Sequence, residues 1–69
     1  MHAGDMYIAK HNFEVFVADG DFLDLITIKE GTIIMISEMR GDGRVRMLAD
    51  ETLCYSYSSW FMKNTEKVL

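Results

Sequence analysis

The chain of 69 residues contains no proline and a single cysteine, Cys54. A lone cysteine cannot form an intramolecular disulfide, whereas small secreted domains usually carry several, so the composition indicates a reducing compartment. We therefore expect a cytoplasmic protein. The N-terminus has no basic start followed by an apolar run, and no apolar stretch approaches the roughly 18 residues of a membrane span. Neither a signal peptide nor a membrane association is expected.

The sequence also lacks a surplus of basic residues, because 11 acidic side chains stand against 7 basic ones and give a formal charge of −4. This balance disfavours indiscriminate binding to phosphate backbones and favours partners with a basic surface. A hydrophobic fraction of 49% with 26% charged residues excludes a disordered chain. The length allows one domain.

What the chain does contain is a hydrophobic period of two residues, which is typical of β-strands. It predicts a strand over residues 12–17, with Phe13, Val15 and Val17 on one face. Residues 32–38 are so rich in β-branched side chains that we expect a central strand there. Residues 22–28 fit either a strand or a loop with inward apolar side chains, and periodicity does not separate the two.

The second half of the chain alternates strands with turn signals. Asp42-Gly43, flanked by basic residues, predicts a hairpin that leads into a strand over residues 44–47. A second turn precedes residues 52–57, which alternate in period two and should pair back as a meander. Ser58 or Ser59 can cap one helical turn, and the last residues are expected to form a short edge strand.

These elements predict an all-β fold, a five-stranded small barrel with one short helical turn before the last strand. Closure of the sheet would bury its apolar face and remove unpaired edges. We expect residues 12–69 to form this barrel domain. Residues 1–11 are an N-terminal extension whose order the pattern leaves open.

The order of one strand, a long loop, a three-strand meander, a helical turn and a short last strand resembles the Src-homology-3-like small barrel. Residues 58–63 stand where that family places its single 3₁₀ turn, and residues 65–68 where its final strand returns to the first. The early alanine-leucine-tyrosine-aspartate-tyrosine run, the tryptophan pair and the proline of true Src-homology-3 domains are absent. The resemblance therefore implies a small barrel and not a proline-peptide groove.

Very short proteins of this shape are also similar to small phage-encoded products of Gram-positive hosts, many of which bind a host protein. That resemblance implies an inhibitor or modulator of a protein partner. It carries no motif of its own, so the candidate contact residues come from the chemistry of this chain.

An acidic loop is the first candidate contact surface. Asp19, Asp21 and Asp24 lie within six residues, where the small-barrel resemblance places carboxylates that face basic ligands. Such a cluster would steer a basic partner and speed its encounter. Residues 19–30 superficially fit a calcium loop, but Leu23 and Asp24 occupy positions that require an oxygen ligand and a glycine. A solvated acidic loop without a metal is expected.

The aromatic turn is the second candidate surface. Trp60 either projects sideways from the helical turn, where with Tyr57 it would form a binding hot spot, or plugs one end of the barrel. Both alternatives stay open at this point. The leading hypothesis is a non-enzymatic protein-binding module that uses the acidic loop, Tyr57 and Trp60.

Two further hypotheses remain. The basic side chains of the second half could bind nucleic acid, and the residues that would do so are Arg40, Arg44, Arg46 and Lys63. A self-associating subunit is the third hypothesis, since a domain this small is marginally stable. Nucleophilic catalysis would require Cys54 with His2 or His11, but no glycine elbow surrounds the cysteine, so a packed side chain, no enzyme activity and no cofactor are expected.

Overall fold

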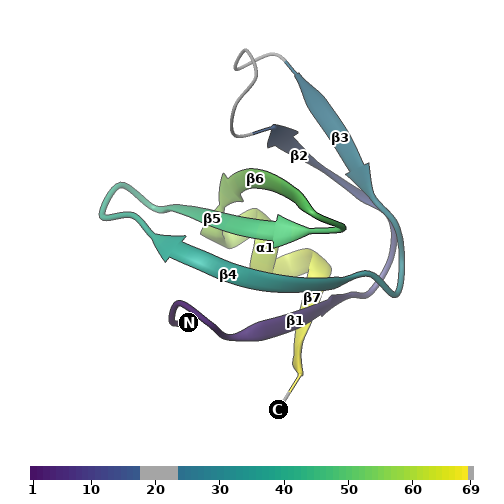
Figure 1. Ribbon diagram of the computed structural model, residues 1–69, viewed down its shortest axis with the longest axis horizontal. Coiled ribbons are helices and arrows are strands. Elements are labelled where there is room, and N and C mark those ends of the chain that lie inside the picture. Colours follow the sequence, from purple (N-terminus) through teal and green to yellow (C-terminus); the bar gives the residue numbers. More distant parts are fainter. Residues whose placement is uncertain (18–23, 69) are drawn as a thin grey trace.

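Seven strands and one helix make up the part of the chain that the computed structural model describes, residues 1–17 and 24–68 (Figure 1). In chain order they are β1 (Met6–Ala9), β2 (Phe13–Val17), β3 (Leu25–Ile28), β4 (Ile33–Met39), β5 (Arg44–Ala49), β6 (Thr52–Tyr57), α1 (Ser58–Asn64) and β7 (Thr65–Val68). The helix is short. Among the described residues, no helix has the length and hydropathy that crossing a membrane requires.

All strands belong to one antiparallel sheet in the order β3-β2-β6-β5-β4-β1-β7. The sheet curls into a half-barrel, with β3 and β7 at its two edges (Figure 1). The all-β class and the β4–β5–β6 meander were predicted correctly. The prediction of five strands in a closed barrel was wrong.

β1 is the strand that the sequence pattern missed. Its four residues are all apolar, so no alternation of polarity marks them, yet Tyr7 and Ala9 are buried while Met6 and Ile8 face outward. It lies between β4 and β7, within the segment expected as an N-terminal extension. The last strand therefore returns to β1 and not to the strand at residues 13–17.

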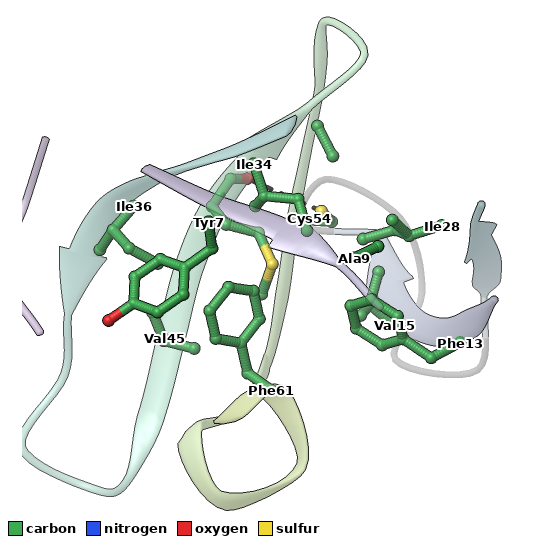
Figure 2. Packing of buried hydrophobic residues seen from close by; sticks show 12 residues of the cluster. Tyr7, Ala9, Phe13, Val15, Ile28, Ile34, Ile36, Val45, Cys54 and Phe61 are labelled. Carbon is green, nitrogen blue, oxygen red and sulfur yellow. Dashed lines mark hydrogen bonds between the residues drawn. The ribbon is translucent and has the colours of Figure 1, made fainter. Parts of the chain in front are cut away.

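The concave side of the sheet is filled by Phe61 of α1, which explains why the sheet remains open. The Phe61 side chain is fully buried, and its ring centroid lies 5.1 Å from that of Tyr7 and 6.4 Å from that of Phe13, both edge to face. Figure 2 shows it projecting from the helix into the core. Because the helix covers the apolar side, the sheet buries its core without pairing its two edges.

The alternation in β6 places small side chains inside. Cys54 and Ser56 are buried, whereas Tyr55 is half-buried and Tyr57 is exposed. α1 packs against β6, so the small inward residues accommodate the helix and its Phe61 side chain. The largest side chains of this strand are thus left on the outer face.

The hydrogen bonds at both ends of α1 tie it to the sheet. The predicted serine cap was wrong: Tyr57 is the N-cap residue without a side-chain cap bond, and the Ser58 amide donates to the Gly43 carbonyl at 2.8 Å. At the other end, the buried Asn64 donates through Nδ2 to the Trp60 carbonyl at 2.7 Å. That bond is internal to the helix, but the Asn64 carbonyl also accepts from the Lys10 amide at 2.9 Å. The helix orientation is therefore fixed by the β4–β5 hairpin at one end and by the segment between β1 and β2 at the other.

The two hairpin turns of the meander differ in their residues. The predicted Asp42-Gly43 turn is confirmed: Gly43 has a φ of 87° and the Arg40 amide donates to the Arg44 carbonyl at 2.9 Å. The β5–β6 turn places Asp50 and Glu51 at φ values of 48° and 64°. Positive φ at both central residues matches the twist of a tight hairpin, but side chains with a Cβ atom adopt it at a steric cost.

Replacement of Glu51 by glycine should therefore raise the free energy of unfolding by about 1 kcal/mol, because glycine adopts positive φ without that cost. Urea denaturation measures the change. The matched control is Glu66→Gly on β7, where the backbone is a strand and the same replacement should lower stability. An equal decrease in the free energy of unfolding in the two variants would contradict this account of the turn.

The buried Cys54 thiol should make stability fall at alkaline pH. Its Sγ lies 3.7 Å from the Met47 carbonyl oxygen, and burial raises the pKa of the thiol to about 11. The pKa of an unfolded cysteine is about 8.5, so between these values the unfolded chain binds fewer protons than the folded one. Stability should therefore fall as pH rises from about 9 to about 11.

Thermal unfolding over that pH range, compared with a Cys54→Ala variant, measures this effect. Both chains contain the same tyrosines, so only the difference between them reports the thiol. The melting temperature of the unmodified chain should fall more steeply with pH than that of the variant. Parallel pH profiles would contradict this prediction, because they would show that folding does not raise the pKa of the Cys54 thiol.

Candidate binding groove around Trp60

The site is built where the pairing of β2 with β6 ends. Phe16 lies opposite Tyr55 in this pairing, and two residues earlier the Glu14 carbonyl accepts a hydrogen bond from the Trp60 indole, with Nε1 at 3.0 Å. The indole thus takes the place of a neighbouring strand at this carbonyl. The hydrogen bond fixes Trp60 between α1 and β2 and leaves its ring half-exposed.

Two grooves adjoin this tryptophan, and Glu14 and Trp60 line both of them. The first has a volume of about 440 Å³, and its lining residues are Glu14, Phe16, Leu25, Ser56, Tyr57, Ser59 and Trp60. The second has a volume of about 430 Å³, and its lining residues are His11, Asn12, Phe13, Glu14, Thr27, Trp60 and Asn64. Both lie between the β2–β3 hairpin and α1.

The first groove is mostly apolar and aromatic. Tyr57 is 55% exposed and Trp60 is 45% exposed, which are high values for side chains of this size. Phe16 completes one wall and stacks on Tyr55, with ring centroids 5.1 Å apart. Leu25 is exposed on β3 at the facing side. Exposed Trp and Tyr side chains gathered in one hollow are typical of protein contact surfaces.

A hydrogen-bond network around Asn64 holds the second groove in shape. Because its Nδ2 donates to the Trp60 carbonyl, Asn64 presents Oδ1 to His11, whose Nε2 lies 2.5 Å away and acts as the donor. The backbone carbonyl of Asn64 also accepts from the Lys10 amide at 2.9 Å. The segment between β1 and β2 is thereby tied to the end of α1.

The charge around the first groove is acidic. Among the described residues that line this groove, the charged one is Glu14. Asp24 is exposed and directly precedes Leu25, another lining residue, in the sequence. The Asp24 carbonyl accepts from the Val17 amide at 3.1 Å, so this residue closes the described base of the β2–β3 hairpin. Two cations lie nearby, outside the groove lining. The Lys63 ammonium is 5.9 Å from the Trp60 ring centroid. Arg44 stands opposite Tyr57 in the sheet, lies 6.0 Å from the Tyr55 ring centroid and is paired with Asp42.

Three of the residues predicted for protein binding can be placed. Tyr57 and Trp60 line the same groove, which answers the open question about the tryptophan in favour of an exposed side chain. Asp24 stands beside that groove in the chain. Asp19 and Asp21 lie outside the described residues, and their role stays a prediction.

Sequence reasoning missed Glu14, Phe16 and Leu25. The alternation of residues 12–17 already placed Glu14 and Phe16 on the face opposite Phe13, and an aromatic residue on that face was the available signal. Their meeting with Trp60 depends on a contact between residues 46 positions apart, which no local pattern encodes.

The residues of the nucleic-acid hypothesis fall on two elements: Arg40, Arg44 and Arg46 on the β4–β5 hairpin, and Lys63 on α1. The Arg44 guanidinium donates to one carboxylate oxygen of Asp42, Oδ2, through Nε at 2.8 Å and through Nη2. This hydrogen bond lowers the pKa of the Asp42 carboxyl and raises that of the guanidinium. Because Arg44 is already paired with a carboxylate, nucleic-acid binding stays a prediction without a contact that favours it.

Comparison of the chain with protein-family models, with curated proteins and with solved structures finds no match. The first groove combines exposed aromatic side chains, of which Trp60 is fixed by its hydrogen bond to Glu14, with the carboxylate of Glu14 in its described lining.

Proposed function

We propose that the chain is a non-enzymatic protein-binding module and that the groove around Trp60 takes an extended segment of its partner. The partner segment combines apolar side chains, which cover the exposed aromatic side chains of the groove, with lysine or arginine side chains, which face the carboxylate of Glu14. By covering the surface that it binds, a cytoplasmic module of this size would inhibit or modulate its partner, as small phage-encoded proteins do to host proteins.

The observation that carries the proposal is the fixed and half-exposed Trp60 side chain. Its indole nitrogen is held by the Glu14 carbonyl and its own carbonyl by Asn64, so little conformational freedom remains to be lost on binding. Together with the exposed Tyr57 it offers a large apolar surface with polar atoms at its edge. Such preorganised aromatic residues dominate the binding energy of many protein interfaces.

The strand order supports the finer proposal of a Src-homology-3-like barrel. The β2–β3 hairpin corresponds to the long loop of that fold, β4 to β6 form the meander, and α1 precedes a last strand that returns to β1. The groove then lies beside the long loop. The residues that give the true Src-homology-3 groove its proline specificity are absent, so a different peptide chemistry is expected here.

Charge complementarity selects the partner chemistry. Glu14 lies in the groove, Asp24 stands next to it, and Asp19 and Asp21 follow β2 in the sequence. A basic segment would be attracted toward this side of the molecule, and its association rate would fall as salt is added. An acidic segment would be repelled.

Selection of peptides from a random dodecamer display library on the purified chain tests this function. Enriched peptides should combine aliphatic or aromatic residues with lysine or arginine, and a bound peptide should change the emission of Trp60, the one tryptophan of the chain. Charge reversal of Glu14→Lys should weaken such peptides about tenfold or more. The matched control Glu66→Lys, an equal charge change on β7 away from the groove lining, should leave binding unchanged.

A second variant separates the acidic loop from the groove. Reversal of all three loop aspartates, Asp19→Lys, Asp21→Lys and Asp24→Lys, should slow association and remove most of its salt dependence. Enrichment of acidic peptides, equal binding by the Glu14→Lys and Glu66→Lys variants, or no enrichment at all would contradict the proposed function.

A further inference from the structure

The two edge strands of the sheet differ in their side chains (Figure 1). β7 contains Glu66 and Lys67, and the Lys67 ammonium lies 3.6 Å from the Asp5 carboxylate. β3 has the sequence Leu-Ile-Thr-Ile and pairs with β2 in an unbroken register. Proteins usually protect an edge strand with charges, proline or a bulge, because its free main-chain groups can pair with another chain. β3 has none of these protections.

The ladder between β2 and β3 identifies the main-chain groups that face the free edge. The Val17 amide donates to the Asp24 carbonyl, so these two residues form a hydrogen-bonded pair. Hydrogen-bonded and non-hydrogen-bonded pairs alternate along an antiparallel ladder. In the observed register, Ile26 and Ile28 therefore turn their amides and carbonyls toward β2. The other two residues of β3 turn theirs away from it.

These two outward residues are Leu25 and Thr27. In the part of the chain that the structure describes, β2 is the strand that pairs with β3, and no strand lies on its other side. The opposite side of β2 follows the same alternation: Glu14, which stands opposite Thr27, turns its carbonyl away from β3 to accept the bond from the Trp60 indole. The free edge of β3 thus presents two amides and two carbonyls to an added strand.

The side chains of the same two residues line the grooves around Trp60. Leu25 lines the first groove and is 51% exposed, and Thr27 lines the second groove and is exposed as well. Directly opposite residues of an antiparallel pair carry their side chains on the same face of the sheet. A strand added beside β3 would therefore place the side chains opposite Leu25 and Thr27 on the groove side of the hairpin.

We propose that the extended segment of the partner binds as an additional strand, antiparallel to β3 along its free edge. This inference rests on the proposed function, because the added strand is the segment that the groove takes. Leu25 and Thr27 each exchange an N–H and a C=O bond with the residue opposite, as in any hydrogen-bonded pair. The main chain of the segment supplies affinity in this mode of binding, and its alternate side chains supply specificity.

The charges at the two ends of β3 indicate the order of residues in the segment. Asp24 is exposed directly before β3, whereas the exposed Lys29 and Glu30, of opposite charge, follow it. A basic side chain is therefore attracted to the start of β3, which an antiparallel segment reaches with its C-terminal side. The expected segment carries a large apolar residue opposite Leu25, followed by lysine or arginine.

A second copy of this chain fits the free edge less well than such a segment. In the antiparallel register that pairs the outward groups along β3, Thr27 of the other copy stands opposite Leu25. Its short side chain would leave the aromatic groove uncovered, whereas a partner segment can carry a large apolar side chain at this position.

Hydrogen exchange of individual amides, measured by NMR, tests strand addition without a variant. The probe is a dodecamer enriched from the display library on the unmodified chain. In the free chain the amides of Leu25 and Thr27 should exchange faster than those of Ile26 and Ile28, which are bonded to β2. Bound peptide should slow the exchange of the two outward amides about tenfold or more and change the two inward amides less.

Proline at position 27 tests the same contact by binding. Thr27→Pro removes an outward N–H without removing a bond to β2, a position that proline tolerates in an edge strand, and it should weaken the peptide about tenfold. Thr27→Val retains the amide and should bind like the unmodified chain. Circular dichroism verifies that both variants remain folded.

A second proline variant controls for proline on an edge strand in general. The Lys10 amide donates to the Asn64 carbonyl, so by the same alternation Lys67 of β7 turns its amide away from β1. Lys67→Pro should therefore leave peptide binding unchanged.

The antiparallel direction is tested with a nitroxide label at either end of the peptide. A label at the C-terminus should broaden the Asp24 amide resonance more than that of Lys29, and a label at the N-terminus should do the reverse. A peptide with the sequence reversed end to end should bind about tenfold more weakly.

The outcomes separate this inference from the proposed function. A peptide that changes the Trp60 emission but leaves the Leu25 and Thr27 amides unprotected would overturn strand addition alone, as would equal binding by Thr27→Pro and Thr27→Val. Protection of these amides by dimers formed without peptide would assign the edge to a second copy. The opposite broadening pattern would exclude the antiparallel direction. A library that yields no binding peptide would overturn both proposals.

Discussion

The insertion of one aromatic side chain from the helix into the curled sheet is the contact on which this fold depends. Phe61 packs edge to face on Tyr7 of β1 and on Phe13 of β2, two strands that lie far apart in the sheet order. Without it the concave face would lose its central filler, and a core of this size has little to replace it. The same contact holds α1 in the position from which Trp60 reaches β2.

The groove around Trp60 is a consequence of that arrangement. Phe61 and Trp60 are neighbours on α1 and project in different directions, one into the core and the other toward the Glu14 carbonyl. Because the helix fills the sheet and replaces a strand partner, the molecule has an open side with aromatic residues along it. A closed barrel would have paired this opening and removed the groove. The unclosed sheet therefore leaves the groove around Trp60 open on so short a chain.

Much of the fold could be predicted from local patterns, and its departures have identifiable causes. The hydrophobic period of two residues and the Asp42-Gly43 turn were sufficient to predict the β4–β5–β6 meander, because each hairpin joins strands that are neighbours in the sequence. β1 was missed because its outward residues, Met6 and Ile8, are as apolar as its inward ones.

The site was predicted only in part, since Tyr57 and Trp60 were identified from residue type while their partners were not. Glu14 and Leu25 come close to them only through tertiary packing. The most direct test of the central role of Phe61 is hydrogen exchange in the unmodified chain and in a Phe61→Leu variant. We expect the Trp60 indole N–H and the β2 amides to be protected in the first and to lose protection together in the second, because the core contact positions the helix. Retained indole protection in a variant with a weakened core would show that Trp60 is held independently of Phe61, which contradicts this account.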